Sequence, residues 1–382
     1  MNSVFSDSAT TIFETMSQLA KAHDAVNLGQ GFPDDPGPEE VRRKAAESAL
    51  SGWNQYPPMM GLPELRQAIA SHYKRMQGLD LDWEKEVMVT SGATEALAGA
   101  LLALLEPGDE VVLFQPMYDA YLPLVRRAGG IPRFVNLRAP GWRINEEDLK
   151  RAFGPKTRAV IFNDPLNPAG SAFPREDLEL LGRYLVRYGA VAICDEVWEH
   201  TVFEGPAHLP LMALPGLRGR CVKIGSAGKI FSLTGWKVGL VCAAPELMKV
   251  LSKAHQYLTF STPPNLQAAV AYGLSLGDDY FRGLKARLRA SHDRLAAGLE
   301  AAGYKVLPSQ ATYFLSVDLG PGEDDAAFCG RMVREARVAA IPVSAFYAEN
   351  HLRNIVRFCF AKKDATLDEA LRRLDAWKRG KV

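Results

Sequence analysis

Residues 86–115 read EVMVTSGATEALAGALLALLEPGDEVVLFQ. Two β-branched runs, 86–90 and 110–115, flank an apolar stretch that ends at Glu106-Pro107-Gly108, a stop signal for a helix. Ser91 stands where the N-cap of that helix is expected, and the helix is predicted over 94–105. The stretch therefore predicts a strand, a helix and a second strand in succession.

The same alternation continues to about residue 245. Further strands are predicted at AVIFND (159–164), AVAICDE (190–196), CVKIGS (221–226) and GLVCAA (239–244). Alternating strands and helices predict an α/β fold with a mostly parallel central sheet covered by helices. Ligands of such sheets bind at the carboxyl ends of the strands, so residues at these ends are the first candidates for a site.

The pattern changes after about residue 285. Leucines at 284, 288, 295 and 299 follow a helical period and precede YKVLP (304–308), TYFLSVDL (312–319), NIVRFCF (354–360) and the amphipathic LDEALRRLDAW (367–377). This part is predicted to be a smaller α+β domain. The expected division is a large domain over 38–285 and a small domain over 1–37 and 286–382, with NLGQGFPDDPGP (27–38) as a loop.

Composition argues against several classes of protein. The 382 residues carry 45 basic and 44 acidic side chains, and no basic block is present, so neither a nucleic acid nor an anionic membrane is an expected partner. The longest apolar run, 96–105, is far shorter than the roughly 20 residues that cross a bilayer, and the N-terminus lacks a signal-peptide pattern. A cytoplasmic protein is expected. The five cysteines include no C-x-x-C pair, which favours buried reduced thiols over disulfides or a zinc site, and no metal site is expected.

Residues 225–229 read GSAGK, and glycine beside lysine at a strand end is a common way to bind phosphate. A Walker A loop is excluded, because Lys223 and Ile230 occupy the positions where that motif needs a glycine and a serine or threonine. No G-x-G-x-x-G follows a predicted strand, so a dinucleotide-binding fold lacks support.

Lys229 can instead form an imine with an aldehyde cofactor, because a neutral amine in a partly desolvated pocket attacks carbonyl groups. Asp195 ends the apolar run VAIC, where a carboxylate is costly without a cationic partner. A pyridinium nitrogen is such a partner, and the pairing of a lysine imine with an aspartate is typical of pyridoxal phosphate. Taken singly, Lys229 would be an ordinary surface charge and Asp195 a helix cap or a structural ion pair.

The phosphate of that cofactor needs a binding site of its own. The helix start at Ser91, Gly92, Ala93 and Thr94 offers backbone N–H groups, hydroxyls and the positive end of a helix dipole. Ser226 and Lys237 flank Lys229 and add a hydroxyl and a charge. Alone, the helix start would be only a cap; together these residues predict a phosphate site.

The sequence resembles the fold-type I, class I/II pyridoxal-phosphate aminotransferases over nearly its whole length. The motifs that carry the resemblance occur in the family's order: NLGQGFPD (27–34), YPPMMGLPELR (56–66), TSGATEAL (90–97), QPMYDAY (115–121), DPLNPAG (164–170), CDEVW (194–198), GSAGKIFSLTGWKVG (225–239) and VRFCFAK (356–362). NLGQGFPD and SAGKIFSLTGWKVG are similar to the branch that contains kynurenine, glutamine and methionine aminotransferases.

The resemblance implies roles around the cofactor. Lys229 would form the imine and move the proton, and Asp195 would pair with the pyridinium. Asn167 would donate to the phenolate oxygen, although an asparagine before proline is also a common turn residue. Tyr118 would stack on the pyridine ring, or else be an ordinary core aromatic.

The resemblance also implies substrate and dimer contacts. Arg357 lies between apolar residues, where a guanidinium is costly unless it meets a carboxylate, and the substrate α-carboxylate suits it. Gly31 would let that carboxylate approach closely, or be a turn glycine. Tyr56 would reach the phosphate of a second copy and Phe260 would line the substrate pocket of the second copy, so both roles require a homodimer.

One position departs from the family pattern. Family members commonly read D-E-V-Y, whereas this chain has Trp198 after Asp195-Glu196-Val197. An indole donates a hydrogen bond but accepts none, so we expect Trp198 to leave more of the contact with the phenolate oxygen to Asn167.

The predicted function is an aminotransferase that moves the amino group of an L-amino acid to a 2-oxo acid by a ping-pong mechanism. Donors with neutral or aromatic side chains, such as glutamine, methionine, phenylalanine or kynurenine, are expected, because no second arginine can be assigned to a distal carboxylate. A carbon–sulfur β-lyase that acts on cysteine conjugates uses the same residues and remains an alternative. A non-catalytic sensor that binds the cofactor is a remote alternative, since no room is left for a DNA-binding domain.

Overall fold

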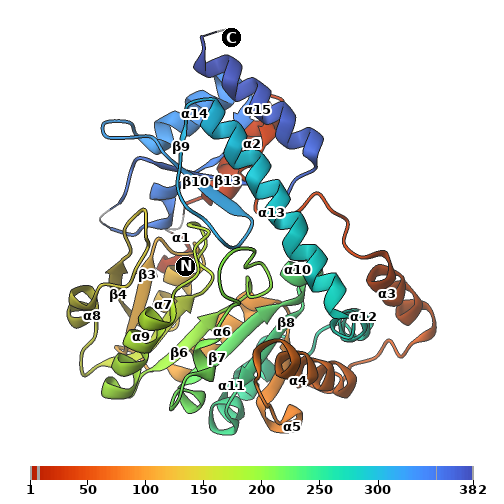
Figure 1. Ribbon diagram of the computed structural model, residues 1–382. Helices are drawn as coiled ribbons and strands as arrows, with labels where there is room; N and C mark the ends of the chain where they lie inside the picture. The colour runs from red at the N-terminus through yellow and green to blue at the C-terminus, as the bar shows by residue number, and fades with distance from the viewer. Residues whose placement is uncertain (1, 7–8, 350, 381–382) are drawn as a thin grey trace.

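A seven-stranded sheet forms the centre of the computed structural model, which describes residues 2–6, 9–349 and 351–380 (Figure 1). The strand order is β2-β8-β7-β6-β5-β3-β4. The strands are β2 (Val87–Thr90), β3 (Glu110–Gln115), β4 (Ile131–Asn136), β5 (Thr157–Asn163), β6 (Val191–Asp195), β7 (Cys221–Ser226) and β8 (Gly239–Ala243).

Six of these strands run in one direction, and β8 alone runs against them. The pairs β7–β6, β6–β5, β5–β3 and β3–β4 are parallel, whereas β8 is antiparallel to both of its neighbours, β7 and β2. The expected mostly parallel sheet is confirmed. The sequence pattern did not predict β4, nor the reversed direction of the strand at 239–243.

Alternate side chains of the strands pack into two apolar cores, one on each face of the sheet. Val111 and Leu113 of β3 belong to one core, and Val112 and Phe114 belong to the other. Helices cover both faces: α3 (Glu39–Ser51), α4 (Pro63–Gln77), α5 (Trp83–Glu86), α6 (Ala93–Leu104), α7 (Tyr121–Arg127), α8 (Glu146–Ala152), α9 (Arg175–Tyr188), α10 (Ala227–Ile230), α11 (Pro245–Leu258) and α12 (Pro264–Leu274). Strands buried on both faces explain the near-continuous apolar runs in the sequence.

A smaller α+β unit joins the two ends of the described chain. Its four-stranded sheet has the order β12-β13-β10-β9, and a separate parallel pair joins β1 to β11 through Val26 and Val338. The elements are α2 (Ile12–Ala22), β1 (Val26–Asn27), β9 (Lys305–Val306), β10 (Phe314–Asp318), α14 (Asp325–Ala336), β11 (Val338–Ala339), β12 (Ile341–Pro342), β13 (Ile355–Cys359) and α15 (Asp364–Lys378). The short helix α1 (Ser3–Ser6) contacts α7 of the large unit.

Helix α13 (Asp278–Ala301) runs from this unit toward α12 and the large sheet (Figure 1). Its Leu284, Leu288, Leu295 and Leu299 are all buried in the core of the smaller unit, as their helical spacing predicts. We propose that the domains divide as expected, 38–285 against 1–37 and 286–382, which places the boundary inside α13.

Candidate active site

The carboxyl ends of three neighbouring strands bring the predicted residues together. Asp195 ends β6, its partner in the register of β5 is Asn163, and β7 ends at Ser226 beside Gly239 of β8. Gly239 in turn pairs with Thr90, the last residue of β2. Polar side chains from distant parts of the sequence therefore meet at one edge of the sheet.

Lys229 lies in the short helix α10, directly after β7. Its Nζ lies 3.4 Å from the carbonyl oxygen of Gly31 and 4.5 Å from the ring centre of Trp198. Burial lowers the pKa of the Lys229 ammonium to about 8. A larger share of this amine is thus neutral near physiological pH than for an ordinary lysine, and the neutral form is the one that attacks an aldehyde.

The carboxylate of Asp195 is buried and held by neutral groups. The hydroxyl of Tyr121 donates to Oδ2 at 2.5 Å, whereas among the described residues Oδ1 receives only a long 3.4 Å contact from the backbone N–H of Val197. Burial raises the pKa of Asp195, and the Tyr121 hydrogen bond opposes that rise. A buried carboxylate with one nearly free oxygen suits a cationic ring nitrogen.

The predicted phosphate site lies at the amino end of α6. The N-cap is Gly92 and not Ser91, since the backbone N–H of Ser91 donates to Glu95 at 2.9 Å and its hydroxyl contacts Thr262 at 3.1 Å. Gly92 has a φ of 84°, and a Cβ there would lie 2.9 Å from Cε and 3.2 Å from Nζ of Lys237. The Lys237 amine is therefore held over the helix start, where N–H groups and positive charge favour an anion.

The backbone of Lys237 is strained at this phosphate site. Lys237 has a φ of 53°, in the left-handed region that side chains with a Cβ avoid at a cost of about 1–2 kcal/mol. The register places Ser226 beside Gly239, and Ala93 and Thr94 form the first turn of α6. These residues, with the lysine amine and the carboxylate, fit a phosphorylated pyridine aldehyde.

Arg357 lies in the middle of β13 and is fully buried. Its guanidinium donates to Asn167 Oδ1 at 2.9 Å and to the carbonyl of Gly29 at 2.8 Å, and its Nε has no hydrogen-bond partner among the described residues. The ring centres of three phenylalanines lie 3.9–5.3 Å from its Cζ: Phe13, Phe314 and Phe346. Burial lowers the pKa of Arg357. A buried cation with an unused donor is suited to a carboxylate ligand.

Gly31 lies beside Lys229 and against the ring of Phe314, whose face Arg357 also contacts. A Cβ on Gly31 would come within 2.7 Å of the ring of Phe314, so only glycine fits there without a shift. Tyr118 lies near Asp195 and Tyr121, its ring meets that of Tyr121 edge to face at 5.7 Å, and burial raises its pKa to about 12.

Two predicted residues lie apart, at the surface. Tyr56 is 81% exposed and Phe260 is 40% exposed, and their rings meet edge to face at 5.6 Å. Phe260 also has a φ of 63°. The roles of Tyr56 and Phe260 toward a second copy stay predictions.

Two buried side chains were missed. Tyr121 holds Asp195, and the amide of Asn163 donates to the Asp195 carbonyl and accepts from the backbone N–H of Asn167. The signal for Asn163 was present in the sequence, because it is a polar residue near the end of the apolar run AVIFND, as Asp195 is in VAICD.

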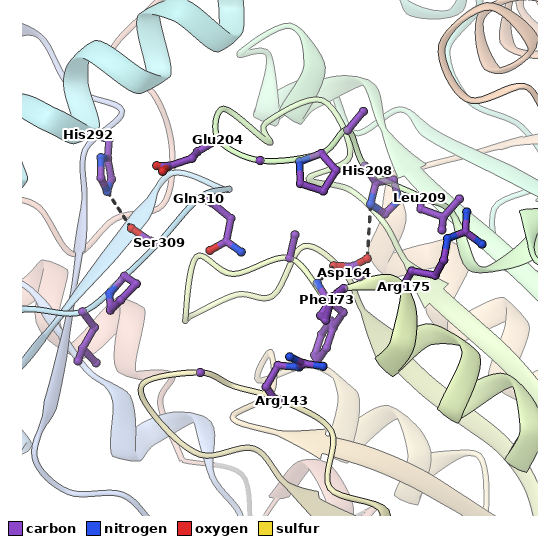
Figure 2. Close-up of a pocket in the computed structure, with 18 of the residues that line it drawn as sticks. Arg143, Asp164, Phe173, Arg175, Glu204, His208, Leu209, His292, Ser309 and Gln310 are labelled. Atoms are coloured by element: carbon purple, nitrogen blue, oxygen red, sulfur yellow. Dashed lines mark hydrogen bonds and ion pairs between the residues drawn. The ribbon is translucent and has the colours of Figure 1, made fainter.

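A separate cavity of about 900 Å³ lies between the two units (Figure 2). Most of its polar side chains already have partners. Arg143 is paired with Asp177, His292 bonds to Ser309, and His208 lies 3.5 Å from Asp164. None of the predicted site residues lines this cavity.

Comparison with known proteins agrees with this geometry. The family model for aminotransferase class I and II matches residues 23–374. A probable N-succinyldiaminopimelate aminotransferase, DapC, of Mycobacterium tuberculosis is 44% identical over 96% of both chains. The methionine aminotransferase of Escherichia coli is 40% identical, with 96% of this chain and 95% of that protein covered.

A solved structure extends the agreement to three dimensions. The N-succinyldiaminopimelate aminotransferase from Mycobacterium tuberculosis superposes with a TM-score of 0.95 and covers 98% of this chain and 99% of that one. The chain belongs to the class I and II aminotransferases, and it is an enzyme that depends on pyridoxal phosphate.

Proposed function

We propose that this aminotransferase takes its amino group from an L-amino acid with a neutral or aromatic side chain and passes it to a 2-oxo acid in a ping-pong reaction. The observation that carries the proposal is the environment of Arg357, a buried guanidinium whose Nε has no hydrogen-bond partner among the described residues and which has three phenylalanine rings around it. The guanidinium suits an α-carboxylate, and the rings suit an apolar or aromatic side chain.

The residues divide the work of the reaction. Pyridoxal phosphate, when bound, supplies an electron sink for the pair released from the substrate Cα–H bond. Lys229, as a neutral amine, would take the proton from the substrate Cα and then deliver it to the carbon that carried the cofactor's aldehyde, which its pKa of about 8 allows near neutral pH. Asp195 would stabilise positive charge on the ring nitrogen, Asn167 and Trp198 would contact the phenolate oxygen, and Tyr118 would stack on the ring.

A second donor has a specific observation in its favour. The relative that is 44% identical over nearly the whole chain is named for N-succinyldiaminopimelate, whose far end carries carboxylates. The donors to be compared are therefore methionine, glutamine, phenylalanine, kynurenine, aspartate and N-succinyldiaminopimelate.

The test is the half-reaction with each donor alone. Purified enzyme loaded with pyridoxal phosphate is mixed with one donor, without an oxo acid, and the cofactor absorbance is followed. We expect rapid conversion with neutral and aromatic donors, slow conversion with aspartate, and none in Lys229→Ala. Conversion by N-succinyldiaminopimelate or aspartate alone would contradict the proposed substrate class. Pyruvate released from a cysteine conjugate would identify β-elimination.

We also propose that the enzyme is a cytoplasmic homodimer. No helix in the described ranges has the length and apolar character needed to cross a bilayer. Large apolar side chains are exposed in two short stretches that meet where Tyr56 touches Phe260: Leu50 (90% exposed), Trp53 and Tyr56 in the first, and Tyr257 (84%), Leu258 and Phe260 in the second. Exposed apolar groups of this size favour burial against a second copy.

A further inference from the structure

The side chain of Asn163 lies between two residues of the candidate site. Asn163 is the last residue of β5 and is buried. Its Nδ2 donates to the carbonyl of Asp195 at 2.8 Å, and its Oδ1 accepts from the backbone N–H of Asn167 at 2.8 Å. The Asn163 amide thus bonds to the backbone of both Asp195, the residue assigned to the pyridinium nitrogen, and Asn167, the residue assigned to the phenolate oxygen.

The side chain of Asn163 supplies hydrogen-bond partners to buried backbone groups on both sides of it. Asn167 lies in a turn between Pro165 and Pro168, which have no N–H to donate, and its own buried N–H finds its acceptor in Asn163. On the other side, β6 ends at Asp195, whose carbonyl receives the Asn163 amide and a longer 3.2 Å bond from the N–H of Asp164.

The hydrogen bonds continue beyond the cofactor residues. Asn167 Oδ1 accepts from Arg357 at 2.9 Å, and Arg357 donates to the carbonyl of Gly29 at 2.8 Å. A continuous chain therefore runs from Asp195 through Asn163 and Asn167 to the guanidinium assigned to the substrate carboxylate. Asn163 is the member that joins the cofactor end of this chain to the substrate end.

We propose that Asn163 is a positioning residue that sets the distance between Asp195 and Asn167, and through Asn167 the position of Arg357. The inference rests on the proposed function, because it assigns Asp195 and Asn167 to opposite edges of one cofactor ring. An amide is required: a leucine of similar size makes neither bond, and an aspartate would set a negative charge against the Asp195 carbonyl. Misplacement of reacting groups by about 1 Å costs roughly 100-fold in rate.

The experiment compares Asn163→Leu with wild type in three measurements. They are the absorbance titration of the bound cofactor with pH, the dissociation constant of pyridoxal phosphate, and the rate of the half-reaction with the best donor. We expect the cofactor titration midpoint to rise by about one pH unit, because both partners that stabilise the deprotonated form are loosened. We expect pyridoxal phosphate to bind about tenfold more weakly, and the half-reaction to slow by about 10- to 100-fold.

Two controls distinguish a positioning role of Asn163 from a role in stability alone. Thr157→Val removes another hydrogen bond of the large unit, from the backbone N–H of Gly154 to Thr157 Oγ1 at 2.8 Å, at the start of β5 and so at the opposite end of that strand from Asn163. It should lower thermal stability without moving the cofactor titration. In an Asn167→Ala background, Asn163→Leu should slow the half-reaction by a smaller factor than in wild type, because Asn163 acts partly through Asn167.

Superimposable titration curves, or rate effects that multiply independently in the double variant, would overturn the proposal. Asn163→Ser, a smaller change, is the second variant if the leucine protein does not fold, and the same outcomes are expected. If no donor reacts with wild type, the proposed function fails, while the titration and the binding constant still judge the role of Asn163.

Discussion

The amine of Lys229 is buried between Gly31 and Trp198, and this environment sets the pH at which it becomes a nucleophile. Burial disfavours the ammonium form, while the nearby Asp195 carboxylate partly restores it. With a pKa of about 8 the amine is protonated below that pH and neutral above it.

The first prediction follows from the lowered pKa of Lys229. The rate at which apoprotein covalently captures pyridoxal phosphate should rise with pH and level off above about 8, because only the neutral amine attacks the aldehyde. Stopped-flow absorbance from pH 6 to 10 measures it, and Lys229→Ala should show no covalent step. A rate that keeps rising toward the ordinary lysine pKa would mean that the amine is not desolvated.

Trp198 carries the second prediction. Its ring faces the Lys229 amine at 4.5 Å, a cation–π distance that favours a positive nitrogen, and an indole cannot accept a hydrogen bond. In Trp198→Tyr, a phenol would donate to the phenolate and the ring would attract the cation less. The titration midpoint of the bound cofactor should fall by up to about one pH unit.

The absorbance titration of Trp198→Tyr is compared with that of Trp377→Tyr. Trp377 lies in α15, and its indole donates to Glu335 at the surface, so this control should match wild type. Coinciding titration curves for wild type, Trp198→Tyr and Trp377→Tyr would show that Trp198 does not affect the titration of the bound cofactor.

At the scale of the element, the amino end of α6 is built for an anion by one glycine. Gly92 adopts a φ of 84°, and the side chain of Lys237 passes over the place where a Cβ would stand. The third prediction is that Gly92→Ala weakens binding of pyridoxal phosphate at least about tenfold, because the added methyl displaces the lysine and strains the turn.

Gly78→Ala is the matched control for this change. Gly78 caps α4 with a φ of 69°, and a Cβ there would meet nothing within 4 Å. Both variants should lose about 1 kcal/mol of unfolding free energy from backbone strain. In a fluorescence titration, only Gly92→Ala should bind pyridoxal phosphate more weakly. Equal affinities of Gly92→Ala and Gly78→Ala would show that Gly92 does not belong to the phosphate site.

Single elements also show where sequence patterns suffice. The bounds of β3 and β7 agree with the predicted runs, because both strands are buried on both faces and are mostly apolar. The one charge inside β7, Lys223, is buried and paired with Glu196 and Glu199. Strand β4 was missed, since it is an edge strand with alternating exposure and contains Pro132 and Arg133. The cap of α6 was placed one residue too early, at Ser91, because serine is a common cap and the left-handed Gly92 gives no such signal.

At the scale of the whole molecule, the exposed aromatics predict an assembly. The fourth prediction is that the protein sediments at twice its chain mass of 41.9 kDa. A Leu50→Glu and Tyr257→Glu double variant should sediment as a monomer, because two buried carboxylates would stand in the interface. The monomer should also bind pyridoxal phosphate more weakly, since the proposed contact of Tyr56 with the partner's phosphate is lost.

Val186→Glu provides the control for the sedimentation experiment. Val186 is 53% exposed on α9, far in the sequence from both stretches, and its replacement should leave the dimer intact. A wild type that sediments as a monomer, or a double variant that remains a dimer, would show that the exposed aromatics serve another purpose.

The sequence by itself determined the class of fold and the chemistry of the site. The spacing of apolar residues that predicts strands and helices is a local property of the chain. A lysine or aspartate at the end of an apolar run indicates a functional site, because burying its charge is costly. Only the tertiary structure decided that β8 runs against its neighbours, that Asn163 joins Asp195 to Asn167, and that Arg357 meets both Asn167 and Gly29. These contacts join residues up to 328 positions apart in the chain, and their geometry depends on the packing of the two units, which no local pattern encodes.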